Sequence, residues 1–296
     1  MKVLISGANG FLGQHLTIFL AKRNITVAAC SRGECRIPLQ HVFEYLPAEL
    51  TNRESVNEVV AQVKPEVIVH TAAMSKPDEC NEQRAKCLLH NVEVTKYLAE
   101  AALQLDVKPH FIYVSTDFVF GENGPHSEDD EKGPLNFYGE SKLMSEQFVA
   151  ASGLRYTIIR PVFIYGKTWP GLRPSFLHWV KQNLETGNRI KVVSDQLRTP
   201  TYVEDICNGI YTVIMEGQMG TFHLAGKDVI SPYEMAVTIA KTLGLDAALI
   251  TNVTSDSFIE PVKRAKRSGL KIDKAEKILQ YSPVTFAEGV KLTFNT

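Results

Sequence analysis

The chain opens with a short apolar segment that leads directly into a glycine-rich turn. Lys2 to Ser6 carries consecutive valine, leucine and isoleucine residues, and Gly7-Ala8-Asn9-Gly10-Phe11-Leu12-Gly13 follows. Apolar residues then recur every three or four positions from Leu12 to Leu20, which is the spacing of one face of a helix. A strand, a glycine turn and a helix in this order predict the first unit of a parallel α/β sheet.

Further apolar segments of strand length alternate with amphipathic segments of helix length. The expected strands are Thr26 to Cys30, Val42 to Leu46, Glu66 to His70, Phe111 to Ser115 and Tyr156 to Pro161. Helices are expected up to Val63 and from Asn91 to Leu105. This alternation predicts an α/β fold with a doubly wound, Rossmann-type parallel sheet, in which ligands bind at the carboxyl ends of the strands.

The spacing Gly-x-x-Gly-x-x-Gly after a strand is typical of a turn that binds the diphosphate of a dinucleotide. Gly7 permits the tight turn, Gly10 lets the backbone approach the phosphates, and Gly13 lets the helix pack close to the sheet. The positive end of the helix then faces the phosphates. After His70, the small residues Thr71-Ala72-Ala73 leave room for a cofactor. The alternative is an ordinary strand-to-helix turn, and the position directly after the first strand favours the nucleotide.

The residues after the second strand indicate which cofactor is bound. In NAD-binding proteins a carboxylate near this point accepts hydrogen bonds from the ribose 2′-hydroxyl, whereas an arginine accommodates a 2′-phosphate. Here Ser31-Arg32 follows the strand, and no carboxylate precedes Glu34. The sequence therefore favours NADPH, with NADH as the alternative, although Arg32 is equally typical of a solvated loop.

Tyr138 and Lys142 lie four residues apart on an expected helix after the strand that ends at Ser115. Side chains at this spacing share one face of a helix. A nearby ammonium stabilises a phenolate, so we expect Lys142 to lower the pKa of Tyr138 and make it a proton donor and acceptor. Thr116 is placed to hydrogen-bond the same reacting oxygen. The Tyr-x-x-x-Lys pattern alone is common in helices, and its expected place beside the glycine turn is what indicates catalysis.

Regularity falls off after the strand that ends at Pro161. A helix ending at Glu185, a strand from Ile190 to Val193 and a capping box at Ser231-Pro232-Tyr233-Glu234 are the clearest later elements. The sequence predicts a dinucleotide-binding domain and a smaller C-terminal substrate domain. The expected bounds are residues 1–166 and 191–224 for the first and residues 167–190 and 225–296 for the second.

Composition argues against several other classes of protein. The 296-residue chain has a formal net charge of −1, which gives no reason to expect a nucleic-acid partner. Its five cysteines show no metal-ligand spacing, so we expect reduced thiols in a cytoplasmic protein and no catalytic metal. No apolar segment is long enough to span a membrane. We expect the acidic segment Gly121 to Pro134 to be an exposed loop or a lid. We expect the basic run Lys263 to Arg267 to be a solvated surface, with binding of anionic ligand groups as the less common alternative.

Together these motifs resemble those of the extended short-chain dehydrogenase/reductases, and the resemblance covers almost the whole chain. The chain is similar to the dTDP-4-dehydrorhamnose reductase group at Ser115 to Phe120, Pro134 to Gly139 and Val193 to Thr201. That group commonly has tyrosine in place of Phe118, and it favours Gly-Gln before the third glycine, where this chain has Gly10-Phe11-Leu12. Both departures bear on substrate choice rather than on proton transfer.

The resemblance implies hydride transfer from NADPH to the 4-keto carbon of a nucleotide-linked 4-keto-6-deoxy sugar. By this similarity Tyr138 protonates the developing alkoxide, Thr116 hydrogen-bonds the same oxygen, and Lys142 holds the nicotinamide ribose. The expected cofactor-binding residues are Gly7, Asn9, Gly10, Phe11, Leu12, Gly13, Ser31, Arg32, Leu50, Ala72, Ala73, Asn91, Tyr138, Lys142 and Pro161. The expected substrate-binding residues are Ser75, Asp117, Phe118, Gln196 and Arg198. A homodimer is one expected assembly.

Two other functions stay open. A sugar-nucleotide epimerase or dehydratase recycles its cofactor, and dehydratases of this type usually place Asp and Glu directly after the threonine. Here Asp117 is followed by Phe118, so the second acid is missing. The other alternative is a non-catalytic, NADP-binding regulatory subunit, because the regulatory subunit of methionine adenosyltransferase resembles the same group.

Overall fold

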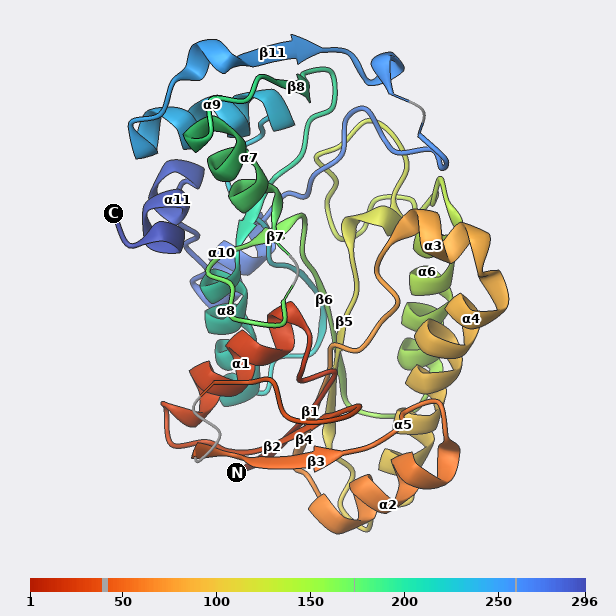
Figure 1. Ribbon diagram of the computed structural model, residues 1–296. Coiled ribbons are helices and arrows are strands. Elements are labelled where there is room, and N and C mark those ends of the chain that lie inside the picture. The colour runs from red at the N-terminus through yellow and green to blue at the C-terminus, as the bar shows by residue number, and fades with distance from the viewer. Residues whose placement is uncertain (39–41, 173, 259) are drawn as a thin grey trace.

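A seven-stranded sheet forms the centre of the computed structural model, which describes residues 1–38, 42–172, 174–258 and 260–296 (Figure 1). In spatial order its strands are β10 (Gly220–His223), β6 (Tyr156–Arg160), β5 (His110–Val114), β4 (Val67–His70), β1 (Lys2–Ser6), β2 (Thr26–Ser31) and β3 (Glu44–Pro47). All neighbouring strands are parallel, so their carboxyl ends meet along one edge. The chain turns back between β1 and β4, which is where such sheets bind ligands.

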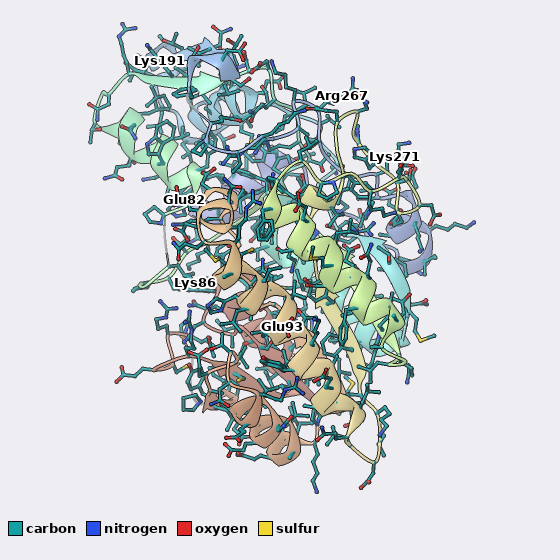
Figure 2. The ribbon with its side chains drawn as sticks, turned by 90° about the vertical axis from the view of Figure 1, so that its right-hand side faces the viewer. Glu82, Lys86, Glu93, Lys191, Arg267 and Lys271 are labelled. Carbon is teal, nitrogen blue, oxygen red and sulfur yellow. The ribbon has the colours of Figure 1, made fainter. Side chains whose placement is uncertain are left out.

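Helices cover both faces of this sheet, which confirms the doubly wound fold. One face carries α1 (Phe11–Ala21), α8 (Val203–Glu216) and α10 (Asp273–Leu279). The other carries α2 (Arg53–Val63), α5 (Val94–Leu103) and α6 (Phe137–Ala151). Figure 2 shows α5 and α6 side by side, with Glu93 marking the start of α5. Each helix buries an apolar face against the strands.

Short helices connect the strands to these layers. Between β4 and α5 the chain forms α3 (Pro77–Glu82), α4 (Arg84–Leu88) and a single π-helical turn, η2 (Leu89–Glu93). After β5 it forms the 3-10 turn η3 (Asp117–Val119). The helix expected from Asn91 to Leu105 is therefore the end of a longer helical run, and its last regular residue is Leu103.

A second, smaller group of elements, at the top of Figure 1, has a hydrophobic core of its own. It contains α7 (Phe176–Glu185), α9 (Pro232–Leu243), α11 (Phe286–Phe294), β8 (Ile190–Val193), β11 (Ile250–Val253) and the 3-10 turns η4 (Ala247–Leu249) and η5 (Ser255–Ser257). The strands β7 (Ile164–Tyr165) and β9 (Thr201–Tyr202) form a further two-stranded pair. The predicted capping box is present, because Ser231 and Glu234 bond to each other's backbone amides at the start of α9.

One expected boundary is wrong. Residues 191–193 were predicted to belong with the central sheet, but β8 pairs with β11, and Ile190 and Val192 lie in the core of the smaller group. The apolar alternation in this segment identifies a strand without identifying its partner, which lies 60 residues further along the chain. The division into two domains otherwise stays a prediction.

The acidic segment from Gly121 to Pro134 is packed in its middle part rather than exposed. Glu128 is buried, and its carboxylate accepts a hydrogen bond of 2.9 Å from the backbone N–H of His223. The ring of His126 stacks on Phe120 with centroids 4.6 Å apart. His126 also bridges to Leu270, far along the sequence. These long-range contacts anchor the segment, so the expected exposed loop is corrected, and the contacts argue against a lid.

A buried ion pair ties α6 to β6. Arg160 donates from Nε and Nη2 to the two carboxylate oxygens of Glu146, at 2.8 and 2.6 Å. Only 4% and 5% of the two side chains are exposed. Because both hydrogen bonds are formed in a site without solvent, each charge depends on the other for stabilisation. The pair therefore fixes the helix that carries Tyr138 against the sheet.

We expect Glu146→Ala to lower the free energy of unfolding by about 3–5 kcal/mol, since the variant leaves a buried guanidinium without its partner. The matched control is Glu185→Ala, which removes the partly exposed Lys181–Glu185 pair of α7 and should cost much less. Urea denaturation at pH 7 measures both changes. Equal losses in the two variants would show that the buried pair has no special structural role.

Candidate active site

The glycine turn brings two backbone segments into direct contact. Gly7 has a φ of +76°, and a Cβ at this position would lie 2.5 Å from the backbone nitrogen of Ala72. A Cβ at Gly13 would lie 2.4 Å from the carbonyl oxygen of Gly7. Neither position accepts a side chain without backbone movement. The first helix, α1, begins after Gly10 with no side chain capping its amides, so its positive end is open to an anion.

A groove follows the carboxyl edge of β1, β2 and β4. It consists of two adjoining cavities of about 600 and 390 Å³, which share residues from the glycine turn and from both neighbouring strand ends. The shared residues include Asn9, Gly10, Arg32, Ala73 and His90. Because the cavities have these walls in common, they form one elongated site of the shape that a dinucleotide needs.

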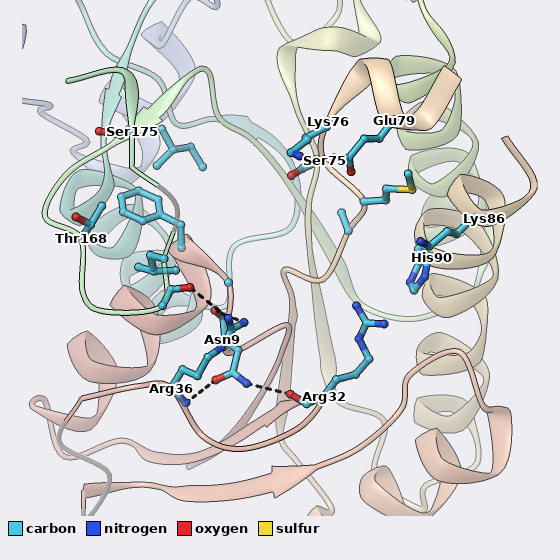
Figure 3. Close-up of a pocket in the computed structure, with 17 residues that line it drawn as sticks. Asn9, Arg32, Arg36, Ser75, Lys76, Glu79, Lys86, His90, Thr168 and Ser175 are labelled. Carbon is cyan, nitrogen blue, oxygen red and sulfur yellow. Dashed lines mark hydrogen bonds and ion pairs between the residues drawn. The ribbon is translucent and has the colours of Figure 1, made fainter. Parts of the chain in front are cut away.

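Figure 3 shows that basic side chains reach this groove from opposite sides. Arg32 and Arg36 follow β2, whereas Lys86 and His90 come from α4 and η2 on the facing wall. Thr168, from the loop after β7, lies on the third side. Only Arg32 among these residues was expected from the sequence. Arg36 lies four positions after Arg32 in the same loop, so the sequence already contained a second arginine that could have been predicted to line the groove.

The predicted cofactor residues fall into two groups. Those that line the groove are Gly7, Asn9, Gly10, Phe11, Ser31, Arg32, Leu50, Ala72 and Ala73. Those outside its described lining are Leu12, Gly13, Asn91, Tyr138, Lys142 and Pro161. Leu12 packs in the core between α1 and the sheet. The cofactor roles of both groups stay predictions.

Two asparagines hold the walls of the groove rather than projecting free donors into it. The amide of Asn9 donates to the carbonyl oxygens of Arg32 and Glu34, at 3.1 and 2.9 Å, and accepts from the N–H of Arg36 at 2.9 Å. Asn91 is buried, accepts from the N–H of Met74 at 2.7 Å and donates to the Met74 carbonyl at 3.1 Å. Both side chains therefore fix backbone segments that form the groove.

The environment of Arg32 differs from the sequence expectation in one respect. Its side chain is 65% exposed, and its guanidinium lies 3.8 Å from the carboxylate of Glu49. Glu49 and Leu50 also line the groove, from the connection between β3 and α2. The segment before Glu34 contains no carboxylate, but the fold brings the carboxylate of Glu49, from further along the chain, to the same place. Arg32 nevertheless remains accessible to a phosphate.

Tyr138, Thr116 and Lys142 come together at the carboxyl end of β5. Asn136 caps α6 by accepting from the N–H of Gly139 at 3.1 Å, which places Tyr138 in the first turn of the helix. Thr116 lies two residues beyond the end of β5, near enough to the Tyr138 phenol to lower its pKa. Only 8% of Tyr138 and 2% of Lys142 are exposed. The site is therefore almost fully withdrawn from water.

The expected effect of Lys142 on the Tyr138 pKa is not found in this structure. The Lys142 ammonium donates to the carbonyl oxygen of Val114 at 2.8 Å and lies 4.1 Å from the centroid of the Tyr113 ring. Burial raises the pKa of Tyr138, and the interaction with Thr116 opposes this only in part. Burial lowers the pKa of Lys142 to about 7. Loss of water, which favours the neutral form of both groups, thus outweighs any attraction between them.

A smaller cavity of about 220 Å³ lies beside Tyr138. Ser75 lines both this cavity and the groove, so the two spaces adjoin at that residue. Phe118 lines the cavity and contacts the edge of the Tyr138 ring, with centroids 5.5 Å apart. Asp117 and Arg198 also line it. Four of the five predicted substrate residues therefore surround one space.

The fifth predicted substrate residue, Gln196, lies behind the cavity wall. Its amide accepts from Nη2 of Arg198 at 2.7 Å and donates to Glu260 at 2.9 Å, so it positions Arg198. Burial raises the pKa of Asp117, and the neighbouring Arg198 acts against that shift. Arg264 also lines the cavity and donates to both carboxylate oxygens of Asp78. Of the two expectations for the basic run, a solvated surface does not describe Arg264, and contact with an anionic ligand group stays a prediction.

Across residues 1–38, 42–172, 174–258 and 260–296, no helix is long and apolar enough to cross a membrane. Within the same ranges no group of three or more His, Cys, Asp or Glu side chains is arranged to hold a metal ion.

The lowered pKa of Lys142 predicts a dependence of stability on pH. Between about pH 7 and pH 10 the unfolded chain holds a proton that the folded chain releases, so this group makes the free energy of unfolding rise with pH. Below pH 7 the cost of the buried charge is fully present. Lys142→Met should therefore be more stable than the wild type at pH 6, and this advantage should shrink by pH 9.

Urea denaturation at both pH values measures this difference. Lys181→Met, on the partly exposed face of α7, is the matched control and should track the wild type at both values. A gap between wild type and Lys142→Met that stays constant from pH 6 to pH 9 would contradict a lysine with a pKa near neutrality.

The comparisons with known proteins agree along the whole chain. The family model described as the RmlD substrate binding domain matches residues 1–296. The mouse protein named methionine adenosyltransferase 2 subunit beta is 30% identical over 298 residues, covering 98% of this chain and 86% of that protein.

Two solved structures are similar in both sequence and fold. A dTDP-4-dehydrorhamnose reductase ortholog from Clostridium acetobutylicum is 31% identical with a TM-score of 0.86, covering 100% of this chain and 99% of that chain. A dTDP-4-dehydrorhamnose reductase from Bacillus anthracis, in complex with NADP, is 26% identical with a TM-score of 0.86, covering 99% and 98%. The predicted resemblance is confirmed: this chain belongs to the RmlD substrate binding domain family.

Proposed function

We propose that this protein is an NADPH-dependent reductase of a nucleotide-linked 4-keto-6-deoxy sugar. The proposal rests on two observations. The groove and the smaller cavity adjoin at Ser75, and Phe118 both lines the cavity and contacts the ring of Tyr138. A cofactor in the groove and a sugar in the cavity would then approach each other beside a proton donor. The names of the two similar crystal structures support the same reaction.

The groove fits NADPH by its shape and by its charges. The uncapped amides of α1 suit the diphosphate, and the exposed guanidinium of Arg32 suits the 2′-phosphate. Arg36 and Lys86 add positive charge along the same walls. Bound there, the cofactor supplies the hydride that reduces the keto carbon.

The protein's own contribution is to supply a proton and to exclude water. Because burial raises the pKa of Tyr138, its phenol keeps its proton at neutral pH and can donate it to an oxygen that gains negative charge. Thr116 is placed to hydrogen-bond that oxygen. Lys142, one helical turn away with a pKa of about 7, exchanges protons readily at neutral pH and can return one to the phenolate.

The smaller cavity suits a deoxy sugar. Its aromatic wall of Phe118, Phe120 and Phe163 provides apolar contact for a carbon without a hydroxyl group. Asp117 and Arg198 stand among these rings and offer hydrogen bonds to sugar hydroxyls or a charge for the diphosphate. The proposed substrate is therefore recognised by apolar and polar contacts in one space.

Two alternatives rest on specific observations. A dehydratase is disfavoured because Phe118 occupies the place of its second acid and packs on the Tyr138 ring. An epimerase recycles its cofactor, so net NADPH consumption would exclude it. The similarity to the mouse methionine adenosyltransferase subunit is the observation that points to a regulatory role. We retain it as the second candidate, since an intact set of Thr116, Tyr138 and Lys142 is compatible with either role.

The remaining expectations become proposals of the same kind. We propose the two predicted domains, with β8 reassigned to the smaller one, and a homodimer as the assembly to be tested. The cysteines Cys30, Cys80, Cys87 and Cys207 are thiols rather than disulfides, which suits a cytoplasmic location.

The reaction itself is tested by supplying a dTDP-linked 4-keto-6-deoxy sugar with NADPH. A reductase should consume NADPH mole for mole and yield a sugar nucleotide heavier by two hydrogens. Tyr138→Phe keeps the ring and removes the proton, so turnover should fall by about 100-fold or more while NADPH affinity barely changes. Absorbance and mass spectrometry measure these outcomes. NADPH binding without turnover across dTDP-, UDP- and GDP-linked keto sugars would favour the regulatory role.

The cofactor preference is tested at Arg32. The parent protein should bind NADPH more tightly than NADH, and Arg32→Glu should erase or reverse the preference, because a carboxylate repels the 2′-phosphate. Lys22→Glu makes the same change of charge just beyond the other end of α1 and should leave the preference intact. Fluorescence titration measures all the dissociation constants. Equal affinities in the parent protein would remove the basis for assigning this role to Arg32.

A further inference from the structure

Two thiols meet behind the wall of the groove. Cys80 on α3 and Cys87 on α4 are seven residues apart, which in a straight helix would separate them by about 10 Å. Gln83 breaks the helix between them, with φ of −120° and ψ of 56°. Beyond this break both thiols belong to one buried cluster, and each side chain shifts the pKa of the other. Neither is exposed to solvent.

These thiols are packed directly against the candidate catalytic tyrosine. Cys80, Cys87 and Tyr138 are the buried residues of one small cluster, with Met74 and Phe118 at its edge. The cluster joins the helices that form the groove wall to the helix that carries Tyr138. A change in the bonding of the thiols is therefore transmitted to both ligand spaces.

Hydrogen bonds fix each thiol to one of these walls. Cys80 donates to the carbonyl oxygen of Met74 at 3.3 Å. Cys87 donates to the hydroxyl of Ser141 on α6 at 3.4 Å and accepts from the amide of Asn91 at the same distance. On the other side of the same helices Lys86 reaches the groove (Figure 3). One short helical segment thus separates the thiols from a solvent-filled site.

We propose that Cys80 and Cys87 form a disulfide when the protein meets a hydroperoxide, and that this bond inactivates the adjacent active site. The Cys87 thiolate attacks one peroxide oxygen, the O–O bond breaks, and a sulfenic acid forms as hydroxide leaves. The Cys80 sulfur then attacks Cys87 sulfur, the S–S bond forms, and the S–O bond breaks with release of water. Two thiols lose two electrons, and hydrogen peroxide is reduced to two waters.

The surroundings distinguish Cys87 from the other buried thiols. The neighbouring Cys80 side chain lowers the pKa of Cys87, and Ser141 and Lys142 act in the same direction against burial. Burial raises the pKa of Cys30 to about 12 and that of Cys207 well above its ordinary value. The thiolate is the reactive form, so Cys87 is the expected first target.

The disulfide would disturb the groove through Met74. Bonding draws the sulfur atoms to about 2.05 Å and removes the hydrogen bonds from Cys80 to Met74 and from Cys87 to Ser141. Met74 lines the groove and is held by Asn91, so displacement of its backbone changes the cofactor site. The loss of activity rests on the proposed reductase function, whereas the oxidation itself does not.

Peptide mapping tests the chemistry without any assay of turnover. The full-length protein is treated with hydrogen peroxide, alkylated and digested with trypsin, which cleaves after Arg84 and Lys86. The disulfide should appear as two linked peptides that dithiothreitol separates. Wild-type protein that keeps both thiols alkylatable, or that carries a sulfinic or sulfonic acid on Cys87, overturns the proposal.

Variants and NADPH titration test the consequence. Cys87→Ser should lose the linked peptides and keep NADPH binding after peroxide, whereas Cys207→Ser, the matched buried control, should behave like the wild type. Peroxide should abolish NADPH binding of the wild type, and dithiothreitol should restore it. If the linked peptides form while NADPH binding stays unchanged, the proposed inactivation is wrong. That outcome would not affect the proposed reductase function, which is tested separately by turnover.

Discussion

The direct contact between the β1–α1 turn and the end of β4 is the constraint on which both ligand spaces depend. Gly7 touches the backbone at Ala72, and Gly13 packs against the carbonyl of Gly7. Helix α1 can therefore start beside the point between β1 and β4 where the strand order reverses. The backbone that leaves this contact runs through Ala73 to Ser75, which lines both the groove and the smaller cavity. A side chain at either glycine would therefore shift the wall of the groove and also the position of the smaller cavity relative to it.

Several polar residues that looked like ligand contacts serve instead to hold this framework. Asn9 binds the loop after β2, Asn91 binds the backbone at Met74, and Gln196 binds Arg198. Buried polar groups need partners, and here the partners belong to the protein. These residues matter for function because they make the walls rigid before a ligand arrives, so that less ordering is needed on binding. They are positioning residues by this geometry.

Local sequence patterns were sufficient for most of the fold, and distant contacts account for what they missed. Apolar periodicity located six of the seven strands of the central sheet and the helices α1, α2, α5 and α6, but neither β10 nor α8, and capping chemistry located the start of α9 at Ser231. The pairing of β8 with β11, the burial of Glu128 and the approach of Glu49 to Arg32 each join segments far apart in the chain. The Tyr-x-x-x-Lys spacing identified two residues on one helical face. It could not show that the Lys142 ammonium turns to the carbonyl of Val114.

Burial of the candidate site has a consequence for how charge moves there. It raises the pKa of Tyr138 and lowers that of Lys142, so the same lack of water favours the neutral form of both residues. A sugar alkoxide formed beside them by hydride transfer would also lack solvation. In such a place an oxyanion is costly unless it is neutralised at once. In the proposed reaction the Tyr138 proton would therefore move as the negative charge develops, rather than after it. Phe118, which makes a T-shaped contact with the Tyr138 ring and lines the smaller cavity, would support this timing by keeping water from the reacting oxygen.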